Sequence, residues 1–346
     1  MNTFPRTGFN GYTSKTFTFK STPEGGSISV DVAYPEETDG SPSTVLIHYH
    51  GGFLIVGDRY SFLPYWLVHA CASRKWIFVT PEYRLIPETT AHAALEDAVD
   101  AYEWTRSSLP DLLGHPVGSV LLAGSSAGGY LALSTASAVV EKPAALLLIY
   151  GLHDPAGSRY TTPGFNIFGR PAIETAPVLR EFPKRKQNED REIISAYALP
   201  ADPAEDRRFS LASALHIDAL FPDYITGVDG LSREMAKRGI EAIPEDHHRL
   251  FPLSFGNLSN IPRTMLLHGL NDSAVPVECS VQAEKKLRAA GSEVFTEFPE
   301  DGEHGFDVRV GNLDVEGAGG DGITAVESLR NVIRFLHSSV TNEASA

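Results

Sequence analysis

The sequence predicts an α/β protein with a mostly parallel, doubly wound sheet and an inserted helical cap. Three observations lead to this fold class. Short apolar runs that lack polar alternation indicate strands buried on both faces. Amphipathic stretches lie between these runs and indicate helices on both faces of the sheet. One long segment, residues 152–261, breaks this rhythm.

The chain opens with two runs in which apolar and polar residues alternate. Phe17 and Phe19 share one face of the first run, and the apolar residues of 28–34 share one face of the second. The residues PEGG at 23–26 suit a turn between them. A period of two predicts an antiparallel pair of strands with one exposed face.

The buried strands and the helices follow from the remaining apolar pattern. Continuous apolar runs predict five further strands, at residues 43–50, 75–80, 119–124, 144–150 and 264–269. The strand-like EVFTEF at 293–298 comes near the end. Apolar residues at helical spacing predict three helices, at residues 91–106, 280–290 and 325–336.

The segment 152–261 is rich in proline, charged and aromatic residues and shows no buried strand. It contains the charged run EFPKRKQNEDREI at 181–193, which we expect to be solvated. A compact domain does not hold so long a loop without structure of its own. We therefore predict a core from residues 1–151 and 262–346 and a helical cap or lid from 152–261. The polar tail SSVTNEASA at 338–346 is predicted to be disordered.

Composition and net charge limit the classes of molecule that the chain is expected to bind. It has 346 residues, 42% of them hydrophobic, and a net charge of -15. An acidic surface repels phosphate backbones and anionic lipid, so we expect no nucleic-acid partner. Its longest apolar run, at 144–151, is too short to cross a bilayer, and we expect no stable membrane insertion.

The two cysteines, Cys71 and Cys279, exclude a disulfide framework and fit a reducing compartment. The first fifteen residues lack the apolar stretch of a secretory signal. We therefore expect a cytoplasmic protein. The sequence leaves open whether it forms a homodimer.

The stretch LLAGSSAGGYLAL at 121–133 contains a tight turn that suits a nucleophile. Gly124-Ser125-Ser126-Ala127-Gly128 follows a buried strand and begins an apolar helix. In that setting G-x-S-x-G predicts a nucleophile elbow with Ser126 at its apex. The amide of Ala127 then faces a developing oxyanion. Ser125 is the rival nucleophile, but its flanking glycines stand at the wrong offset.

A serine nucleophile needs a base, and the base needs a carboxylate that orients it. Asp272 follows the last buried strand, and His304 lies in a turn after residues 293–298. Both therefore emerge at the carboxyl edge of the sheet, together with Ser126. The chain order serine, aspartate, histidine agrees with such a triad. We predict Ser126, Asp272 and His304 as the catalytic residues.

Other residues of the same types are weaker candidates. Asp154, after the preceding strand, is the main rival acid, whereas Asp301 and Asp307 lie too close in sequence to His304. We expect His247 and His248, within the cap, to face solvent.

The residues IHYHGGFLIVGD at 47–58 suit the second half of an oxyanion hole. Gly51 and Gly52 follow a buried strand, and the absence of a Cβ lets their amides approach a substrate oxygen. A metal site on His48 and His50 is the alternative, but no third ligand follows at a suitable spacing. We expect no metal and no cofactor.

With these motifs the chain resembles the hormone-sensitive-lipase-like branch of the α/β-hydrolase superfamily. The residues that carry the resemblance run in the family's order across about 40–312: HGGFLIVGD, PEYRLIPE with the AALEDAVDAYEW helix, GSSAGG, HGLNDSAVPV and GEHGFD. The resemblance implies an α/β-hydrolase core with a lid, and an esterase or lipase that acts on carboxylic esters. It also implies Ser126, Asp272 and His304 as the triad, with amides of Gly51, Gly52 and Ala127 in the oxyanion hole.

Two departures from the family pattern bear on the substrate. Phe53 stands where the family has its third glycine, so its side chain reshapes the pocket. We expect Phe53 and Ser125 to contact the substrate. The second departure is that the region before the first strand is short, so segment 152–261 would form most of the cap. Such an insertion is similar to those of family members that act on bulky natural-product esters or thioesters.

Three functions remain open from the sequence. The first is hydrolysis of an ester or thioester of a small to medium organic molecule through an acyl-enzyme on Ser126. The second replaces water with another acceptor, as in an acyltransferase or in a thioesterase that releases or cyclises a product. The third is a non-catalytic receptor for a small ligand, and His304 argues against it because receptors of this family lack that histidine.

Overall fold

A computed structural model of the chain describes residues 11–22, 26–185, 192–200, 203, 206–317 and 325–341. Its described strands form one sheet in the order β1-β2-β4-β3-β5-β6-β7-β8. Strands β1 and β2 pair antiparallel, β2 pairs antiparallel with β4, and all further neighbours are parallel. The strands are β1 (Tyr12–Ser21), β2 (Ser27–Pro35), β3 (Ser43–Tyr49), β4 (Ile77–Pro81), β5 (Val117–Ser125), β6 (Ala145–Ile149), β7 (Thr264–Leu267) and β8 (Val294–Glu297).

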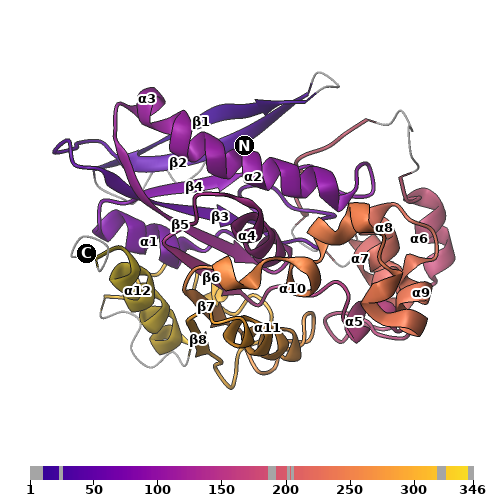
Figure 1. The fold of residues 1–346 in the computed structure, drawn as a ribbon. Coiled ribbons are helices and arrows are strands. Elements are labelled where there is room, and N and C mark those ends of the chain that lie inside the picture. The colour runs from indigo at the N-terminus through magenta and orange to yellow at the C-terminus, as the bar shows by residue number, and fades with distance from the viewer. Residues whose placement is uncertain are drawn as a thin grey trace.

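Helices cover both faces of this sheet (Figure 1). Those of the core are α1 (Tyr65–Ser73), α2 (Ala91–Ser107), α3 (Leu109–Leu113), α4 (Ala127–Ala138), α11 (Glu278–Ala289) and α12 (Val326–Thr341). Buried residues of α2, α4 and α11 join one hydrophobic cluster, and those of α1 and α12 join another. In β5, for example, Leu122 faces the first cluster and Leu121 the second. Burial on both faces explains why the central strands lack polar alternation.

The segment predicted as a cap is helical where it is described. Its elements are α5 (Ser158–Thr161), α6 (Thr175–Glu181), α7 (Arg207–Ile217), α8 (Phe221–Thr226), α9 (Leu231–Arg238), η2 (Gly239–Ala242), η3 (Glu245–Leu250), α10 (Pro252–Phe255) and η4 (Leu258–Asn260). Helices α5 to α9 gather beside one end of the sheet in Figure 1, whereas α10 packs on α4 and α11 of the core. The division at residues 152 and 261 remains a prediction. In the described part of this segment, the β-type pairing consists of one isolated antiparallel bridge, between Tyr197 and Gly57 of the core.

The predicted fold class is confirmed by this sheet, and two details differ from expectation. Helix α1 was not foreseen, because it follows Pro64 without a side-chain cap and is too short for a clear period. Residues 338–341 of the tail predicted to be disordered form the end of α12, where Ser339 is buried. The last five residues of that tail, most of the predicted turn at 23–26 and part of the charged run at 181–193 lie outside the described residues.

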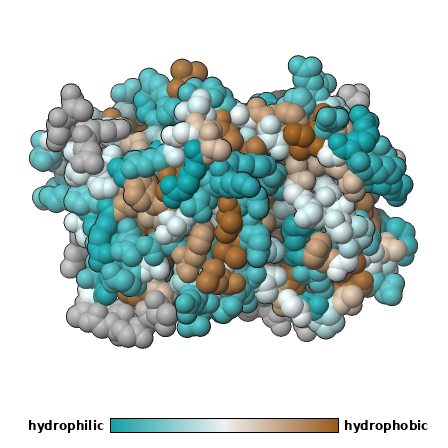
Figure 2. Space-filling view, turned by 60° about the horizontal axis from the view of Figure 1, so that its bottom comes forward, coloured by the Kyte–Doolittle hydropathy of each residue, from teal (hydrophilic) through white to brown (hydrophobic). Residues whose placement is uncertain are grey.

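A short 3-10 turn, η5 (Val308–Val310), completes the described elements. The face of the molecule in Figure 2 is largely hydrophilic, with hydrophobic residues in small groups. Within the described ranges, none of the helices combines the length and the apolar character that crossing a bilayer requires.

Candidate active site

Ser126 stands at the turn between β5 and α4 in a backbone conformation that L-residues rarely adopt. Its φ is 55° and its ψ is -119°. A Cβ on Gly124 would lie 2.0 Å from the carbonyl oxygen of Gly128, and a Cβ on Gly128 would lie 2.0 Å from that of Tyr49. Only glycine fits either position, which explains the G-x-S-x-G spacing. The turn holds the strained serine at the carboxyl end of β5, as a nucleophile elbow does.

His304 connects Ser126 to Asp272. Its Nε2 lies 3.1 Å from the Oγ of Ser126, and its Nδ1 lies 2.6 Å from the Oδ2 of Asp272. The histidine comes from the loop after β8, and the aspartate from the loop after β7. A carboxylate accepts only, so Nδ1 carries the ring hydrogen and Nε2 accepts from the serine hydroxyl. The three side chains predicted from chain order therefore meet in one line of hydrogen bonds.

Asp272 is held as a carboxylate by four donors. Its Oδ1 accepts from the amides of Ala274 and Val275 at 2.9 and 2.8 Å. Burial alone raises the pKa of this carboxyl, but hydrogen bonds from His268 and His304 outweigh burial and hold the pKa well below its usual range. The negative charge therefore persists where it can stabilise a protonated His304 ring.

His268, at the end of β7, is a site residue that the sequence analysis missed. Its Nε2 lies 3.2 Å from the Oδ2 of Asp272 and 2.8 Å from the carbonyl oxygen of Val275. Both are acceptors, so Nε2 carries the hydrogen, and Nδ1 accepts from the hydroxyl of Ser280 at 2.7 Å. The sequence signal is a histidine four residues before the acid, inside an otherwise apolar strand end.

The loop after β3 lies directly opposite Ser126. A Cβ on Gly51 would lie 3.1 Å from the Cβ of Ser126. The carbonyl oxygen of Gly52 accepts from the amides of Ile55 and Val56, which closes the loop into a turn. Among the described residues, no protein group accepts from the amides of Gly51, Gly52, Phe53 or Ala127. These amides are thus available to a substrate oxygen.

Phe53 combines a strained backbone with a buried side chain. Its φ is 59°, and that of the next residue, Leu54, is 63°. The ring is 2% exposed and contacts Phe168 and Phe209 edge to face, at centroid distances of 6.4 and 6.2 Å. Both partners come from segment 152–261. The side chain at the position of the family's third glycine therefore joins the core to the predicted cap.

A cavity of about 220 Å³ opens over Ser126 and His304. Its lining is mainly aromatic and apolar: Gly51, Gly52, Phe53, Phe62, Ser125, Ser126, Tyr150, Phe168, Phe209, His304, Gly305, Val308 and Arg309. Phe53 and Ser125, the two residues predicted to contact substrate, both line it. Ser125 is only 2% exposed, and its Oγ lies 2.9 Å from the Nε2 of His48. Phe168 and Phe209 gave no sequence signal, since aromatic residues are common throughout the segment.

Two of the other acids near the site, Asp154 and Asp307, have partners elsewhere. Lys286 pairs with Asp154 at 2.8 Å, and Asp301 is exposed. Asp307 is fully buried and accepts from the hydroxyl of Tyr150 at 2.6 Å and from the indole of Trp66 at 3.0 Å. Burial raises the pKa of Asp307. Because the ring of Tyr150 lies 4.5 Å from that of His304, Asp307 contacts the site through this tyrosine.

The remaining histidines singled out in the sequence are held in separate structural contacts. His50 stacks on Tyr83, with ring centroids 4.2 Å apart, while His48 bonds Ser125. Burial lowers the pKa of His48 to about 3 and that of His50 to about 4. In the part of the chain that the structure describes, no three metal-ligating side chains converge.

The expectation that His247 and His248 face solvent is wrong. His247 Nδ1 lies 2.8 Å from the Nε2 of His92, and the ring of His248 stacks on Phe255 with centroids 3.6 Å apart. Both residues are half-buried, because η3 packs on α2 and α10.

Comparisons with known proteins agree with this fold. A bacterial heroin esterase superposes on the chain with a TM-score of 0.65 and 18% identity, over 97% of this chain and 87% of that one. A carboxyl esterase from the fungus Tuber melanosporum does so with a TM-score of 0.59 and 17% identity, over 96% and 88%. At such identities these likenesses show the fold alone.

Sequence relatives include parts of larger proteins. The chain is 28% identical to a non-reducing polyketide synthase of Aspergillus calidoustus, over 91% of this chain and 14% of that protein. It thus spans about a seventh of the length of that relative. It is 27% identical to a probable carboxylesterase of a Phoma species, over 80% of this chain and 83% of that protein.

A family model described as "alpha/beta hydrolase fold" matches residues 46–225. The matched range is 180 of the 346 residues and contains the Gly51–Phe53 loop and the Ser126 turn. The chain belongs to the alpha/beta hydrolase fold family.

Proposed function

We propose that the chain is a serine hydrolase that cleaves a carboxylic ester of a small to medium organic molecule. The observation that carries this proposal is the line of hydrogen bonds from Ser126 through His304 to Asp272. The similarity to a protein named as a probable carboxylesterase, from a Phoma species, supports the reaction class. The cavity of about 220 Å³ and the net charge of -15 support a small, apolar substrate rather than a nucleic acid.

Acylation begins at the hydroxyl of Ser126. His304 Nε2 removes the proton of this hydroxyl as the Ser126 Oγ attacks the ester carbonyl carbon. The electron pair of the C=O double bond moves onto the carbonyl oxygen, which becomes the oxyanion. The protonated ring lies against the Asp272 carboxylate, which stabilises its charge. His304 then gives the proton to the departing alcohol, and the acyl group remains on Ser126.

The oxyanion formed in this step needs hydrogen-bond donors. The amides of Gly51, Gly52, Phe53 and Ala127 are the available donors around Ser126, and Ala127 begins α4, whose dipole is positive at that end. Loss of one such donor commonly costs about 3 kcal/mol of transition-state stabilisation.

Deacylation repeats the chemistry with water. His304 removes a proton from the water as it attacks the acyl-enzyme, and the Ser126 oxygen takes the proton back. Phe168 and Phe209, from segment 152–261, cover the cavity, which supports a role for this segment as a cap. None of these steps requires a metal or a cofactor.

The experiment that tests the proposal combines turnover with labelling. Purified chain is assayed with a short-chain activated ester and treated with a fluorophosphonate, and the labelled peptide is identified by mass spectrometry. We expect Ser126→Ala to lose labelling and at least about 1,000-fold in kcat/KM. Ser107→Ala, on the exposed end of α2, is the matched control. Wild-type turnover by Ser126→Ala would rule the mechanism out.

A second candidate keeps the acyl-enzyme but transfers the acyl group to an acceptor other than water, or releases it from a thioester. The similarity over 91% of the chain to part of a non-reducing polyketide synthase favours this candidate. Product analysis with an acyl thioester, with and without an added alcohol, separates it from simple hydrolysis. Free acid as the sole product in both reactions would exclude transfer.

The location of the protein is also a proposal. Cys71 and Cys279 are both unpaired, which supports a reducing, cytoplasmic compartment. Cell fractionation tests this location.

A further inference from the structure

The oxyanion turn, from Gly52 to Val56, has a backbone that L-residues rarely adopt. Gly52, Phe53 and Leu54 follow one another with φ values of 113°, 59° and 63°. Within the turn, the amides of Ile55 and Val56 donate to the carbonyl oxygen of Gly52. A conformation of this kind persists only where the surrounding structure holds it. The contacts made from outside the turn are therefore needed to keep its shape.

Arg208, the second residue of α7, holds the oxyanion turn from segment 152–261. Its Nε donates to the carbonyl oxygen of Ile55 at 2.7 Å, and its Nη2 donates to that of Ile86 at 2.9 Å. The amide of Ile86 in turn donates to the carbonyl oxygen of Leu54 at 2.8 Å. One guanidinium is thus bonded to the turn directly and, through residue 86, a second time.

Glu88 fixes the plane of this guanidinium. Its two carboxylate oxygens accept from Nη1 and Nη2 of Arg208 at 2.7 and 2.5 Å. Paired bonds of this kind between an arginine and a carboxylate set the orientation of both groups. The arginine is only 5% exposed, so its donors serve the protein rather than solvent.

Tyr197 adds a second contact between segment 152–261 and the same loop. Its backbone exchanges two hydrogen bonds with Gly57, each at 2.8 Å, directly after the oxyanion turn. Its hydroxyl donates at 2.8 Å to Asp206, which is the N-cap of α7. The guanidinium carbon of Arg208 lies 5.2 Å from the centre of its ring. The start of α7 is therefore joined to the turn and to the residue that follows it.

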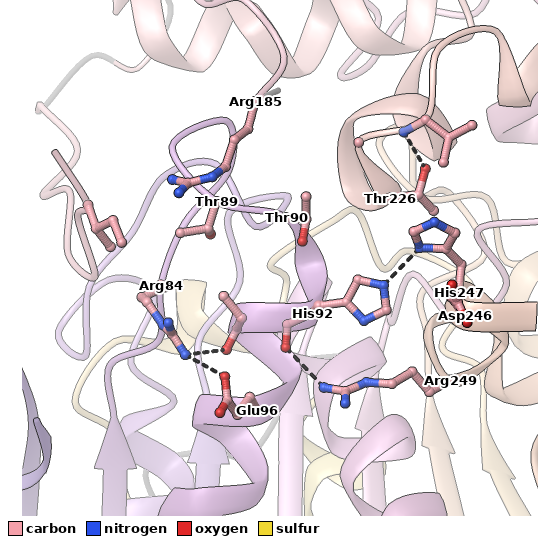
Figure 3. A pocket seen from close by; sticks show the side chains of 14 residues that line it. Arg84, Thr89, Thr90, His92, Glu96, Arg185, Thr226, Asp246, His247 and Arg249 are labelled. Carbon is pink, nitrogen blue, oxygen red and sulfur yellow. Dashed lines mark hydrogen bonds and ion pairs between the residues drawn. The ribbon is translucent and has the colours of Figure 1, made fainter. Parts of the chain in front are cut away.

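The backbone around Glu88 is also bonded to segment 152–261. Arg185 donates to the carbonyl oxygen of Glu88, and Figure 3 shows this arginine beside Thr89, the next residue. Figure 3 also shows Arg249, which donates to the carbonyl oxygen of His92 at 3.2 Å. The glutamate that binds the guanidinium is thus held by its backbone as well as by its carboxylate.

We propose that Arg208 is a positioning residue for the oxyanion hole. It does not line the cavity over Ser126, so it acts through the carbonyl oxygen of Ile55 rather than on the substrate. This bond keeps the amides of Gly52 and Phe53 directed at the oxyanion. The segment predicted as a cap then contributes to the chemical step as well as to the cavity wall. The inference rests on the ester chemistry proposed above.

Steady-state kinetics with a short-chain activated ester test this role. We expect Arg208→Gln to lower kcat at least about 10-fold and to keep KM within about threefold of wild type, because the oxyanion forms only after the substrate has bound. Arg207→Gln is the matched control, since this neighbour in α7 forms an exposed ion pair with Glu181, and it should keep the wild-type kcat. A wild-type kcat for folded Arg208→Gln would overturn the proposal.

A boronic acid inhibitor separates positioning from general damage to the cavity. Its boron accepts an electron pair from the Oγ of Ser126 and becomes tetrahedral, which places one boron-bound oxygen among the oxyanion amides. A carboxamide with the same organic group binds without this bond. We expect Arg208→Gln to weaken the boronic acid at least about 10-fold and the carboxamide less than about threefold. Equal weakening of both inhibitors would contradict a positioning role.

Removal of one partner of a buried ion pair can also prevent folding, so two further variants complete the test. Arg208→Lys keeps a positive charge beside Glu88, but one ammonium cannot replace the planar fork. We expect this variant to fold and to lose at least about threefold in kcat. Glu88→Gln keeps an acceptor for Arg208 and both carbonyl bonds, so it should unfold at a lower urea concentration but retain its kcat. If kcat falls as far in Glu88→Gln as in the Arg208 variants, activity follows stability and the proposal is wrong.

The same assays distinguish this inference from the proposed function. Turnover that depends on Ser126, together with a wild-type kcat in both Arg208 variants, would reject the role of Arg208 and leave the proposed function intact. A wild-type chain without turnover that depends on Ser126 would reject the proposed function, and this inference with it.

Discussion

The Nδ1 of His304 lies 2.6 Å from the Oδ2 of Asp272, 32 residues earlier in the chain. The same carboxylate receives two backbone amides on its other oxygen, so its orientation is determined from both sides. This geometry leads directly to a prediction for a variant of Asp272.

Asp272→Asn should lower kcat about 10³- to 10⁴-fold. The amides of Ala274 and Val275 require the oxygen of the new side chain, so its NH₂ group turns toward His304. That donor favours the tautomer with hydrogen on Nε2, which no longer accepts from Ser126. Steady-state kinetics with an activated ester measure the loss, and Asp301→Asn, in the exposed turn before His304, serves as control. A kcat within tenfold of wild type would contradict the role of Asp272.

Gly128→Ala should destabilise the fold by more than about 4 kcal/mol or leave no folded protein. Its Cβ would lie 2.0 Å from the carbonyl oxygen of Tyr49, in the backbone of a central strand that cannot move aside. Gly157→Ala is the control, because that glycine has a φ of -66° and its nearest contact would be at 3.2 Å. Soluble yield and urea unfolding measure the difference. Equal stability of the two variants would show that the elbow does not need glycine.

Phe53→Gly should be more stable than Phe53→Ala by about 1 kcal/mol. Both variants lose the buried ring, which costs about 3–5 kcal/mol on truncation to alanine. Alanine keeps the backbone penalty at a φ of 59°, whereas glycine does not. Urea unfolding of the pair measures the difference. The reverse order would mean that the backbone at Phe53 is not strained.

Both Phe53 variants should also accept bulkier acyl groups, since the ring lines the cavity over Ser126. The measurement is the ratio of kcat/KM for a long and a short ester of the same alcohol. An unchanged ratio would show that Phe53 does not limit the acyl site.

The free energy of unfolding should fall as the pH drops from about 6.5 toward 4. Burial lowers the pKa of His48 and His153 to about 3 and that of His50 and His216 to about 4. The unfolded chain binds protons at these rings near pH 6.5, and the folded chain does not, so acid favours unfolding. Each ring contributes up to about 1.4 kcal/mol per pH unit. The raised pKa of Asp307 acts in the opposite direction.

His153→Leu isolates one such contribution. Neither ring nitrogen of His153 has a partner among the described groups, so leucine removes the proton uptake without breaking a hydrogen bond. We expect a smaller decrease of stability between pH 7 and pH 5, measured by urea unfolding at each pH. His337→Leu, at an exposed position of α12, serves as the control for the substitution itself. An unchanged slope in His153→Leu would mean that this ring is protonated in the folded protein.

Local chemistry let the sequence predict the sheet and the residues at its carboxyl edge. Glycines 124 and 128 indicate the tight turn, because only glycine tolerates the contacts at 2.0 Å that the structure shows. The apolar runs indicate strands buried on both faces, and chain order singles out Ser126, Asp272 and His304. The catalytic roles of these three residues stay a prediction until the variants are assayed.

Tertiary structure alone decided what surrounds those residues. Phe168 and Phe209 reach the site from the predicted cap, and their sequence neighbours give no sign of it. His268 reaches it from the end of β7, and its only sign in the sequence is its position four residues before the acid. His247 was predicted to face solvent but bonds His92, 155 residues earlier in the chain. The physical reason is the separation of the interacting residues along the sequence. A turn or a strand depends on residues a few positions apart. A cavity and the contacts within it depend on side chains that only the packed fold brings together.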